Sequence, residues 1–151
     1  MLANTAMNER QNIQHKPVIT DKIRKKQIVC TEEEKVRQYT IQHLINDCGV
    51  PSAYIAVEQS MQVVNRRKRA DIVVYDRSFK PMLLVECKAP SVSLGQECYV
   101  QILQYNLTVK APYILITNGL QSFCYSIDLD NESCQIVHEL PKWNEFNYKN
   151  I

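Results

Sequence analysis

Three charged residues stand at segments of the sequence that otherwise read as apolar strands. Asp71 opens the run Asp-Ile-Val-Val, and Glu86 and Lys88 directly follow Leu-Leu-Val. Two carboxylates can hold Mg²⁺, which prefers oxygen ligands, and a bound metal neutralises the charge that grows on a reacting phosphate. An ammonium beside them can orient the attacking water or stabilise negative charge. These residue types therefore predict a metal-dependent site for hydrolysis at a phosphate.

Strand geometry decides whether these groups can meet. Alternate side chains of a strand share a face, so Glu86 and Lys88 point together while Cys87 points away. If the strands that carry Asp71 and Glu86 form a hairpin, the two carboxylates lie side by side. The backbone carbonyl of Cys87 is then a candidate third metal ligand. The plain alternative is a surface Glu–Lys pair and an unrelated aspartate.

Apolar periodicity and turn residues predict the elements that must position this group. Thr31 and Glu34 form a capping box at the start of a helix, and Gly49 ends it. Strands are expected at 54–64, 70–75, 82–87, 113–117, 122–127 and 135–138, and a second helix at 94–109. Turns are expected at Asn65-Arg66 and at Asn118-Gly119.

The order of these elements predicts an α/β (α+β) fold with a central mixed β-sheet flanked by helices. The run at 82–87 is almost unbroken in its apolar character, so this strand is expected to be central and covered on both faces. With 151 residues, 45% of them hydrophobic, the chain fits one compact domain. We expect a flexible N-terminal arm at 1–20 and a single domain at 21–151.

Charge and cysteine content narrow the class of protein. The net charge is only +2, but Arg66, Arg67, Lys68 and Arg69 form a basic cluster immediately before the Asp71 strand. Such a cluster can track DNA phosphates, or it is an ordinary solvated surface. The six cysteines include no Cys-x-x-Cys pair, and no apolar run is long enough to span a membrane. A reduced cytoplasmic protein is therefore expected.

The segments 69–74 (Arg-Ala-Asp-Ile-Val-Val) and 84–90 (Leu-Val-Glu-Cys-Lys-Ala-Pro) together resemble the PD-(D/E)xK nuclease motif. More narrowly, residues 21–125 resemble the nuclease domain at the N-terminus of type I restriction-enzyme R subunits. The resemblance implies a restriction-endonuclease-like core and a DNA endonuclease that uses Mg²⁺, with Mn²⁺ as a substitute. It also implies that Asp71, Glu86 and Lys88 are catalytic. Ala70 stands where the motif has Pro, at a position that varies.

Further site residues follow from this resemblance. In that family a Gln-x-x-x-Tyr motif lies on the helix after the lysine, and Gln101 and Tyr105 match it. They lie one turn apart on one helix face and are expected to line the site. The family also has an acidic residue on its first helix. At about 100° per residue, Glu33 falls at the middle of the apolar face and Glu34 at its edge, which favours Glu33.

Two function classes remain open at this point. The first is a Mg²⁺-dependent DNA endonuclease, and the alternative is a non-catalytic nucleic-acid-binding or assembly module on the same fold. The sequence has no Gly-x-x-x-x-Gly-Lys-Ser/Thr phosphate loop. The chain would therefore be either a free-standing nuclease or a module that works with a separate motor or specificity subunit, and a homodimer is also compatible with the sequence.

Overall fold

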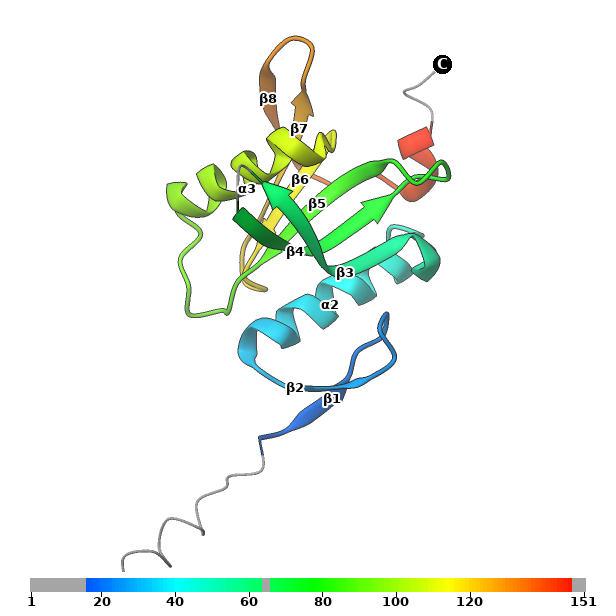
Figure 1. The fold of residues 1–151 in the computed structure, drawn as a ribbon, viewed down its shortest axis with the longest axis vertical. Helices are drawn as coiled ribbons and strands as arrows, with labels where there is room; N and C mark the ends of the chain where they lie inside the picture. The colour runs from blue at the N-terminus through cyan, green and yellow to red at the C-terminus, as the bar shows by residue number, and fades with distance from the viewer. Residues whose placement is uncertain (1–15, 64–65, 148–151) are drawn as a thin grey trace, which may run out of the picture.

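The centre of the fold is a six-stranded mixed sheet with the strand order β3-β4-β5-β6-β7-β8 (Figure 1). The structure is a computed structural model that describes residues 16–63 and 66–147. The strands of this sheet are β3 (Ile55–Val63), β4 (Arg66–Tyr75), β5 (Pro81–Cys87), β6 (Tyr113–Thr117), β7 (Ser122–Asp128) and β8 (Ser133–Val137). β5 and β6 run parallel, and the other neighbours in this sheet are antiparallel. The predicted mixed sheet is confirmed.

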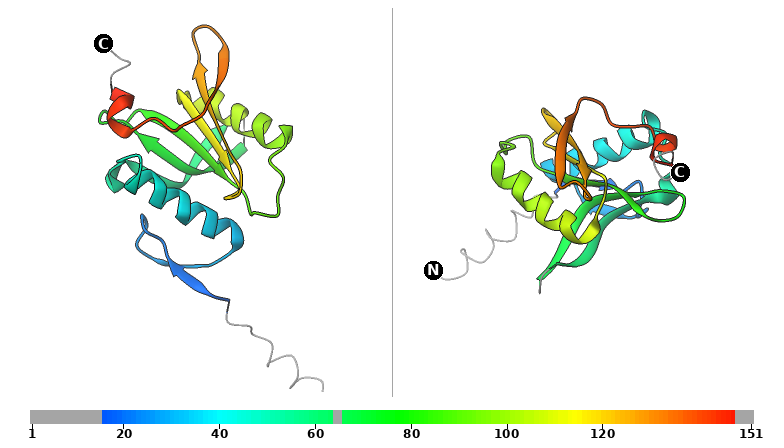
Figure 2. Two further views of the ribbon diagram at one scale, coloured as in Figure 1. Left: turned by 180° about the vertical axis from the view of Figure 1, so that it is seen from behind. Right: turned by 90° about the horizontal axis from the view of Figure 1, so that it is seen from above.

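One helix covers each face of the sheet, as Figure 2 shows. The helices are α2 (Glu32–Asn46) and α3 (Gln96–Val109), and short 3-10 turns lie at Ser52–Tyr54 (η1) and Trp143–Asn147 (η2). Ile41 of α2 belongs to the same apolar cluster as Leu83, whereas Ile102 of α3 belongs to a second cluster with Leu84. Because neighbouring residues of β5 point to opposite faces, this strand is buried on both sides, as predicted.

The predicted bounds of α2 are confirmed by its caps. The Thr31 hydroxyl accepts a hydrogen bond from the Glu34 backbone N–H at 3.0 Å. The reciprocal half of the capping box is not used, since the Thr31 N–H donates to the carbonyl of Val29 at 3.1 Å. The helix ends at Asn46, and Gly49 follows with φ of +72°, a left-handed conformation that favours glycine.

A small hairpin beside α2 was not predicted. β1 (Val18–Thr20) pairs with β2 (Gln27–Val29) in an antiparallel two-stranded sheet. The turn between these strands lies against α2, where the Lys22 N–H donates to Gln38 Oε1 at 3.1 Å. Strands of three residues are too short to show an alternating pattern. Of the predicted arm at 1–20, residues 18–20 form β1, and residues 1–15 lie outside the described part of the chain.

Several boundaries shift by a few residues. β4 already begins at Arg66, so the expected Asn65-Arg66 turn falls partly outside the described residues. α3 begins two residues later than Leu94, and β8 begins two residues before Gln135. Neither helix of the described residues combines the length and the apolarity that a membrane span needs.

Candidate active site

Asp71 and Glu86 lie on neighbouring strands at the centre of the sheet. Ile72 of β4 pairs with Val85 of the antiparallel β5, so Asp71 and Glu86 occupy the next register position. Each residue is only 9% exposed. Burial raises the pKa of Glu86, and the two side chains are close enough for the negative charge of Asp71 to raise it further. The hairpin expected from the sequence therefore exists and brings two carboxyl groups into contact.

Lys88 completes the group that the sequence singled out. Its Nζ lies 3.1 Å from Glu86 Oε1, and the Lys88 side chain is 23% exposed. Burial alone disfavours the ammonium, but the neighbouring Glu86 carboxylate raises the pKa of Lys88 above its ordinary value. Lys88 is therefore a fixed positive charge that faces solvent on one side and the carboxylates on the other.

The pKa of Glu86 is raised to about 7, first by burial and then by the negative charge of Asp71. The ion pair with Lys88 opposes this shift without cancelling it. The site consequently has more negative charge than its buried surroundings favour near neutral pH. Such an excess is what a bound cation would relieve.

Stability should depend on pH through Glu86. The pKa of Glu86 is about 7 in the folded protein and 4.5 ordinarily, so the folded state binds a proton more tightly than the unfolded state. This tighter binding adds to the free energy of unfolding. The contribution is fully present below pH 4.5 and is lost as pH rises through 7. In EDTA, Glu86→Gln should exceed the wild type in free energy of unfolding by about 1–3 kcal/mol at pH 8 and by much less at pH 5. Urea unfolding measures both, with the exposed Glu139→Gln as control. An equal difference at both pH values contradicts the raised pKa.

Arg37 of α2 is a site residue that the sequence analysis missed. Its Nη2 lies 2.6 Å from Asp71 Oδ1, and the side chain is only 6% exposed. The same guanidinium pairs with Glu34 and, at 3.3 Å, with Glu58 Oε1. The other Asp71 oxygen accepts the backbone N–H of Cys87 at 2.7 Å. The orientation of the Asp71 carboxylate is therefore determined by one arginine and one backbone donor.

A sequence signal for Arg37 was present. Arg37, Ile41, Leu44 and Cys48 repeat at helical spacing, and all four side chains are buried. A charged residue on a buried stripe needs an opposite charge nearby. The sequence alone does not say which carboxylate provides that charge, because Asp71 is 34 positions away.

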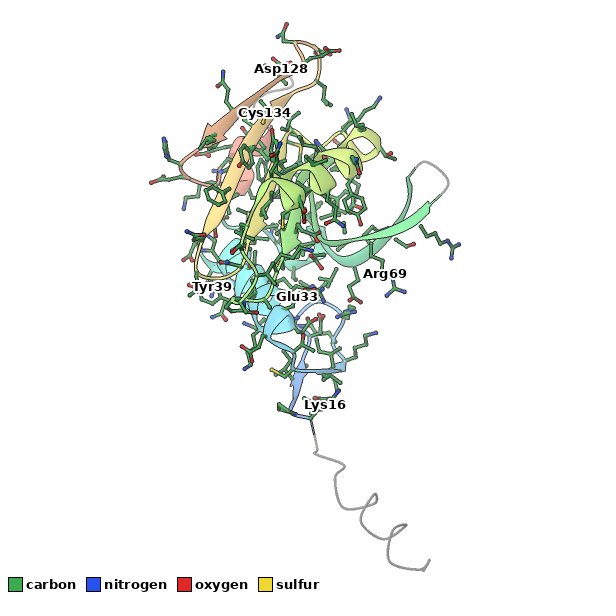
Figure 3. The ribbon with its side chains drawn as sticks, turned by 90° about the vertical axis from the view of Figure 1, so that its left-hand side faces the viewer. Lys16, Glu33, Tyr39, Arg69, Asp128 and Cys134 are labelled. Carbon is green, nitrogen blue, oxygen red and sulfur yellow. The ribbon has the colours of Figure 1, made fainter. Side chains whose placement is uncertain are left out.

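Of Glu33 and Glu34 in the first turn of α2, the buried one is Glu34 and not Glu33, contrary to the expectation from helix geometry. The Glu33 side chain is 44% exposed, whereas that of Glu34 is 10% exposed. Glu34 is buried because the unpredicted turn after β1 covers that side of α2, where Arg24 Nη2 lies 4.0 Å from Glu34 Oε1. Glu33 Oε1 lies 3.6 Å from Nη2 of Arg37, the same nitrogen that contacts Asp71. Burial and the charge of Asp71 raise the pKa of Glu33, while Arg37 opposes the shift. Figure 3 views the molecule from the side that Glu33 occupies.

The helix α3 brings one of its two expected residues to the carboxylates. Tyr105 is 6% exposed, and its pKa is raised by burial and by the charges of Glu86 and Asp71. Gln101 lies one turn earlier, is half-buried and lines an open hollow with Glu97. Its position on the helix matches the expectation, and its contact with the site stays a prediction.

The basic cluster lies on the outer half of β4. Arg67 and Arg69 are exposed, and the side chains of Arg66 and Lys68 lie outside the described part of the structure. Arg69 is labelled in Figure 3, at the base of the hairpin of β3 and β4 that projects from the body of the sheet. The cluster therefore begins two positions before Asp71 and extends away from it along the projecting strand.

The donor set at this site fits Mg²⁺. Within the described residues, no three His, Cys, Asp or Glu side chains lie close enough together to form a metal cluster. The candidate ligands are therefore two carboxylates, Asp71 and Glu86, and the backbone carbonyl of Cys87. Mg²⁺ commonly uses one or two carboxylates and keeps several waters. Although both Asp71 oxygens accept hydrogen bonds, each carboxylate oxygen has a second lone pair for a cation. The surplus negative charge at Glu86 provides the electrostatic reason for such binding.

The fold first places the chain in a structural class. A mixed α/β sheet of this kind occurs in a solved fragment assigned to the HsdR subunit of a type I restriction enzyme from Vibrio vulnificus YJ016. The two structures agree with a TM-score of 0.55 at 21% sequence identity, over 78% of this chain and 24% of that one. The chain thus spans about a quarter of the length of that fragment. At this identity the likeness shows the fold.

The family is shown by a sequence match. A family model described as the N terminus of the type I restriction enzyme R protein matches residues 32–141. Because this match covers more than half of the chain, the chain belongs to that family. The resemblance to R-subunit N termini that the sequence indicated is therefore confirmed. A comparison with curated proteins gives no match.

Proposed function

We propose that this domain is a metal-dependent DNA endonuclease that hydrolyses phosphodiester bonds. The observation that supports this most strongly is the meeting of Asp71, Glu86 and Lys88 at one point of the central sheet. Their contact gives two buried carboxylates and one ammonium the arrangement that phosphate hydrolysis requires. Membership in the family of restriction-enzyme R-subunit N termini favours DNA as the substrate.

Each residue of the site has a role in this proposal. Asp71, Glu86 and the carbonyl of Cys87 would hold Mg²⁺, with Mn²⁺ as a substitute. When bound, the ion lowers the pKa of a coordinated water and offsets charge on the phosphate. Lys88, held 3.1 Å from Glu86, orients the attacking water and stabilises the developing negative charge. Arg37 is a positioning residue, since it holds one oxygen of the Asp71 carboxylate while the Cys87 N–H holds the other.

The proposal also assigns roles to residues on both helices. Tyr105, buried against the carboxylates, can donate its hydroxyl hydrogen to a phosphate oxygen or to Glu86. Gln101 precedes it by one helical turn and would help to position DNA. Glu33 stands at the open side of the site, where it can accept a hydrogen bond from a water that enters.

The exposed basic residues of β4 would hold the DNA backbone near the cut. Neutralising Arg67 and Arg69 to Gln should weaken DNA binding and reduce the log–log salt slope by about one unit per lost phosphate contact. Fluorescence anisotropy over a salt series measures this slope. Lys80→Gln is the matched control, because Lys80 is exposed at the other end of β4, beyond Tyr75. If the slope is unchanged, Arg67 and Arg69 do not contact DNA phosphates.

The test of the proposed function is a cleavage assay on supercoiled plasmid and branched DNA with Mg²⁺, Mn²⁺ or EDTA. The wild type should cut with either metal and not in EDTA, and Glu86→Ala should not cut. Equal cutting by the wild type and Glu86→Ala would show that the activity arises elsewhere. DNA binding without cleavage, under all metal conditions, would instead support the non-catalytic binding module.

The partners follow the family. A domain that covers about a quarter of an HsdR fragment would work with a motor and a specificity subunit, on the same chain or on another. Cleavage of plasmid by this domain alone would show that the motor is not required for the chemistry itself. A second copy of this chain remains a candidate partner, which light scattering during the same experiments can detect.

A further inference from the structure

An aromatic hollow lies between α3 and β7, beside the candidate active site. Its volume is about 280 Å³, and its lining includes Leu94, Tyr99, Ile116, Phe123 and Tyr125. This volume lies just below the roughly 300 Å³ at which pockets for small-molecule ligands begin, which suits a flat group as small as one base. None of these side chains bears a charge at neutral pH.

Strand register places this hollow on the same sheet face as Glu86. Glu86 pairs with Ile116 of β6, and Ile116 pairs with Phe123 of β7. Residues paired across a sheet share a face, and neighbouring strands are about 4.8 Å apart. Phe123 therefore stands in the same cross-strand row as Glu86, about 10 Å away along the sheet. In Figure 1, α3 passes across β6 and β7 on this face.

Contacts hold the rings of Tyr99 and Tyr125 in place, whereas the ring of Phe123 is partly open to solvent. Tyr99 and Tyr125 contact each other with ring centroids 4.8 Å apart and planes inclined at 47°. The Tyr99 hydroxyl donates to Cys134 Sγ at 3.2 Å, which ties α3 to the β7–β8 hairpin where Figure 3 labels Cys134. Phe123 is 37% exposed and belongs to neither apolar core cluster. Two fixed rings and one open phenyl ring form a surface for another flat group.

An uncharged aromatic surface of this size favours an unpaired nucleobase as its ligand. Aromatic side chains stack on nucleobases whose faces are free, and this contact tolerates any sequence because every base has such a face. In a duplex the faces are already covered by neighbouring bases. We propose that Phe123, with Tyr99 and Tyr125, stacks an unpaired base next to the phosphate at Glu86, so that the preferred substrate is single-stranded or branched DNA. This inference rests on the proposed nuclease function.

The experiment measures binding in EDTA, where cleavage does not contribute. Fluorescence anisotropy compares a single-stranded oligonucleotide and a flap with a blunt duplex. Phe123→Ala should lower affinity for the single strand and the flap by about 5- to 150-fold, the range for one lost stacking contact, and leave duplex affinity unchanged. Phe123→Tyr keeps the ring and should bind as the wild type does. Leu107→Ala, at a side chain that is 73% exposed on α3, is the apolar control.

A second probe reports stacking directly. An oligonucleotide with 2-aminopurine at successive positions should lose fluorescence on binding at the position that enters the hollow, and Phe123→Ala should abolish this loss. If duplex cleavage occurs but Phe123→Ala changes neither affinity nor quenching, the hollow is not a base site and the nuclease proposal stands. If the quenching depends on Phe123 but no metal supports cleavage, the base site stands and the nuclease proposal fails.

Discussion

Replacing Lys88 by Ala should reduce DNA cleavage by about 10²-fold or more while Mg²⁺ binding persists. The reason is the position of Nζ, which lies 3.1 Å from Glu86 Oε1 on the more exposed side of the pair. From there the ammonium acts on the water and on the charge of the transition state, without being a ligand. Loss of Lys88 also leaves more negative charge at Glu86, which favours a cation.

Calorimetric titration of Mg²⁺ and single-turnover cleavage together test this separation. Lys80→Ala, at an exposed lysine of the turn before β5, is the control and should retain both properties. Lys88→Arg should restore little cleavage, because a flat guanidinium cannot replace a compact ammonium beside the water. A Lys88→Ala protein that cuts at the wild-type rate would remove Lys88 from the catalytic group.

Replacing Arg37 by Met should lower the free energy of unfolding by about 3–5 kcal/mol at pH 7 without metal. Methionine keeps much of the apolar contact but removes the cation that faces Asp71, Glu34 and Glu58. Breaking a buried ion pair on one side leaves the remaining charges without compensation, and that residual charge determines the cost. This cost is large because Asp71 and Glu34 are both buried, with 9% and 8% of the whole residue exposed.

Urea unfolding of Arg37→Met beside Arg67→Met measures this effect, because Arg67 is exposed on the projecting hairpin. Mg²⁺ should stabilise Arg37→Met more than the wild type, since the ion supplies charge next to Asp71. Lowering the pH should narrow the difference, because protonated carboxyl groups no longer need the cation. A loss below about 1 kcal/mol would mean that solvent already screens the network.

Local patterns in the sequence were sufficient to predict that Asp71, Glu86 and Lys88 lie together on the sheet. The apolar runs at 82–87 and after Asp71 predicted two strands, and Asp71 and Glu86 become neighbours if these strands form a hairpin. Once the two strands pair in this way, the positions of Asp71, Glu86 and Lys88 in the chain make them neighbours in space. The caps of α2 were equally visible, because Thr31 and Gly49 act within one helical turn of their own positions.

The features that the sequence analysis missed depend on contacts between distant segments. Arg37 meets Asp71 across 34 positions, and Glu34 is buried only because a hairpin of three-residue strands closes over it. The aromatic hollow needs α3, β6 and β7 at once. Periodicity describes which side of an element is apolar, but polar side chains on a buried face follow charge and hydrogen bonding. The sequence by itself therefore determined the candidate catalytic group and the sheet that bears it. Only tertiary packing decided which cation orients Asp71 and which rings line the hollow in the same cross-strand row as Glu86.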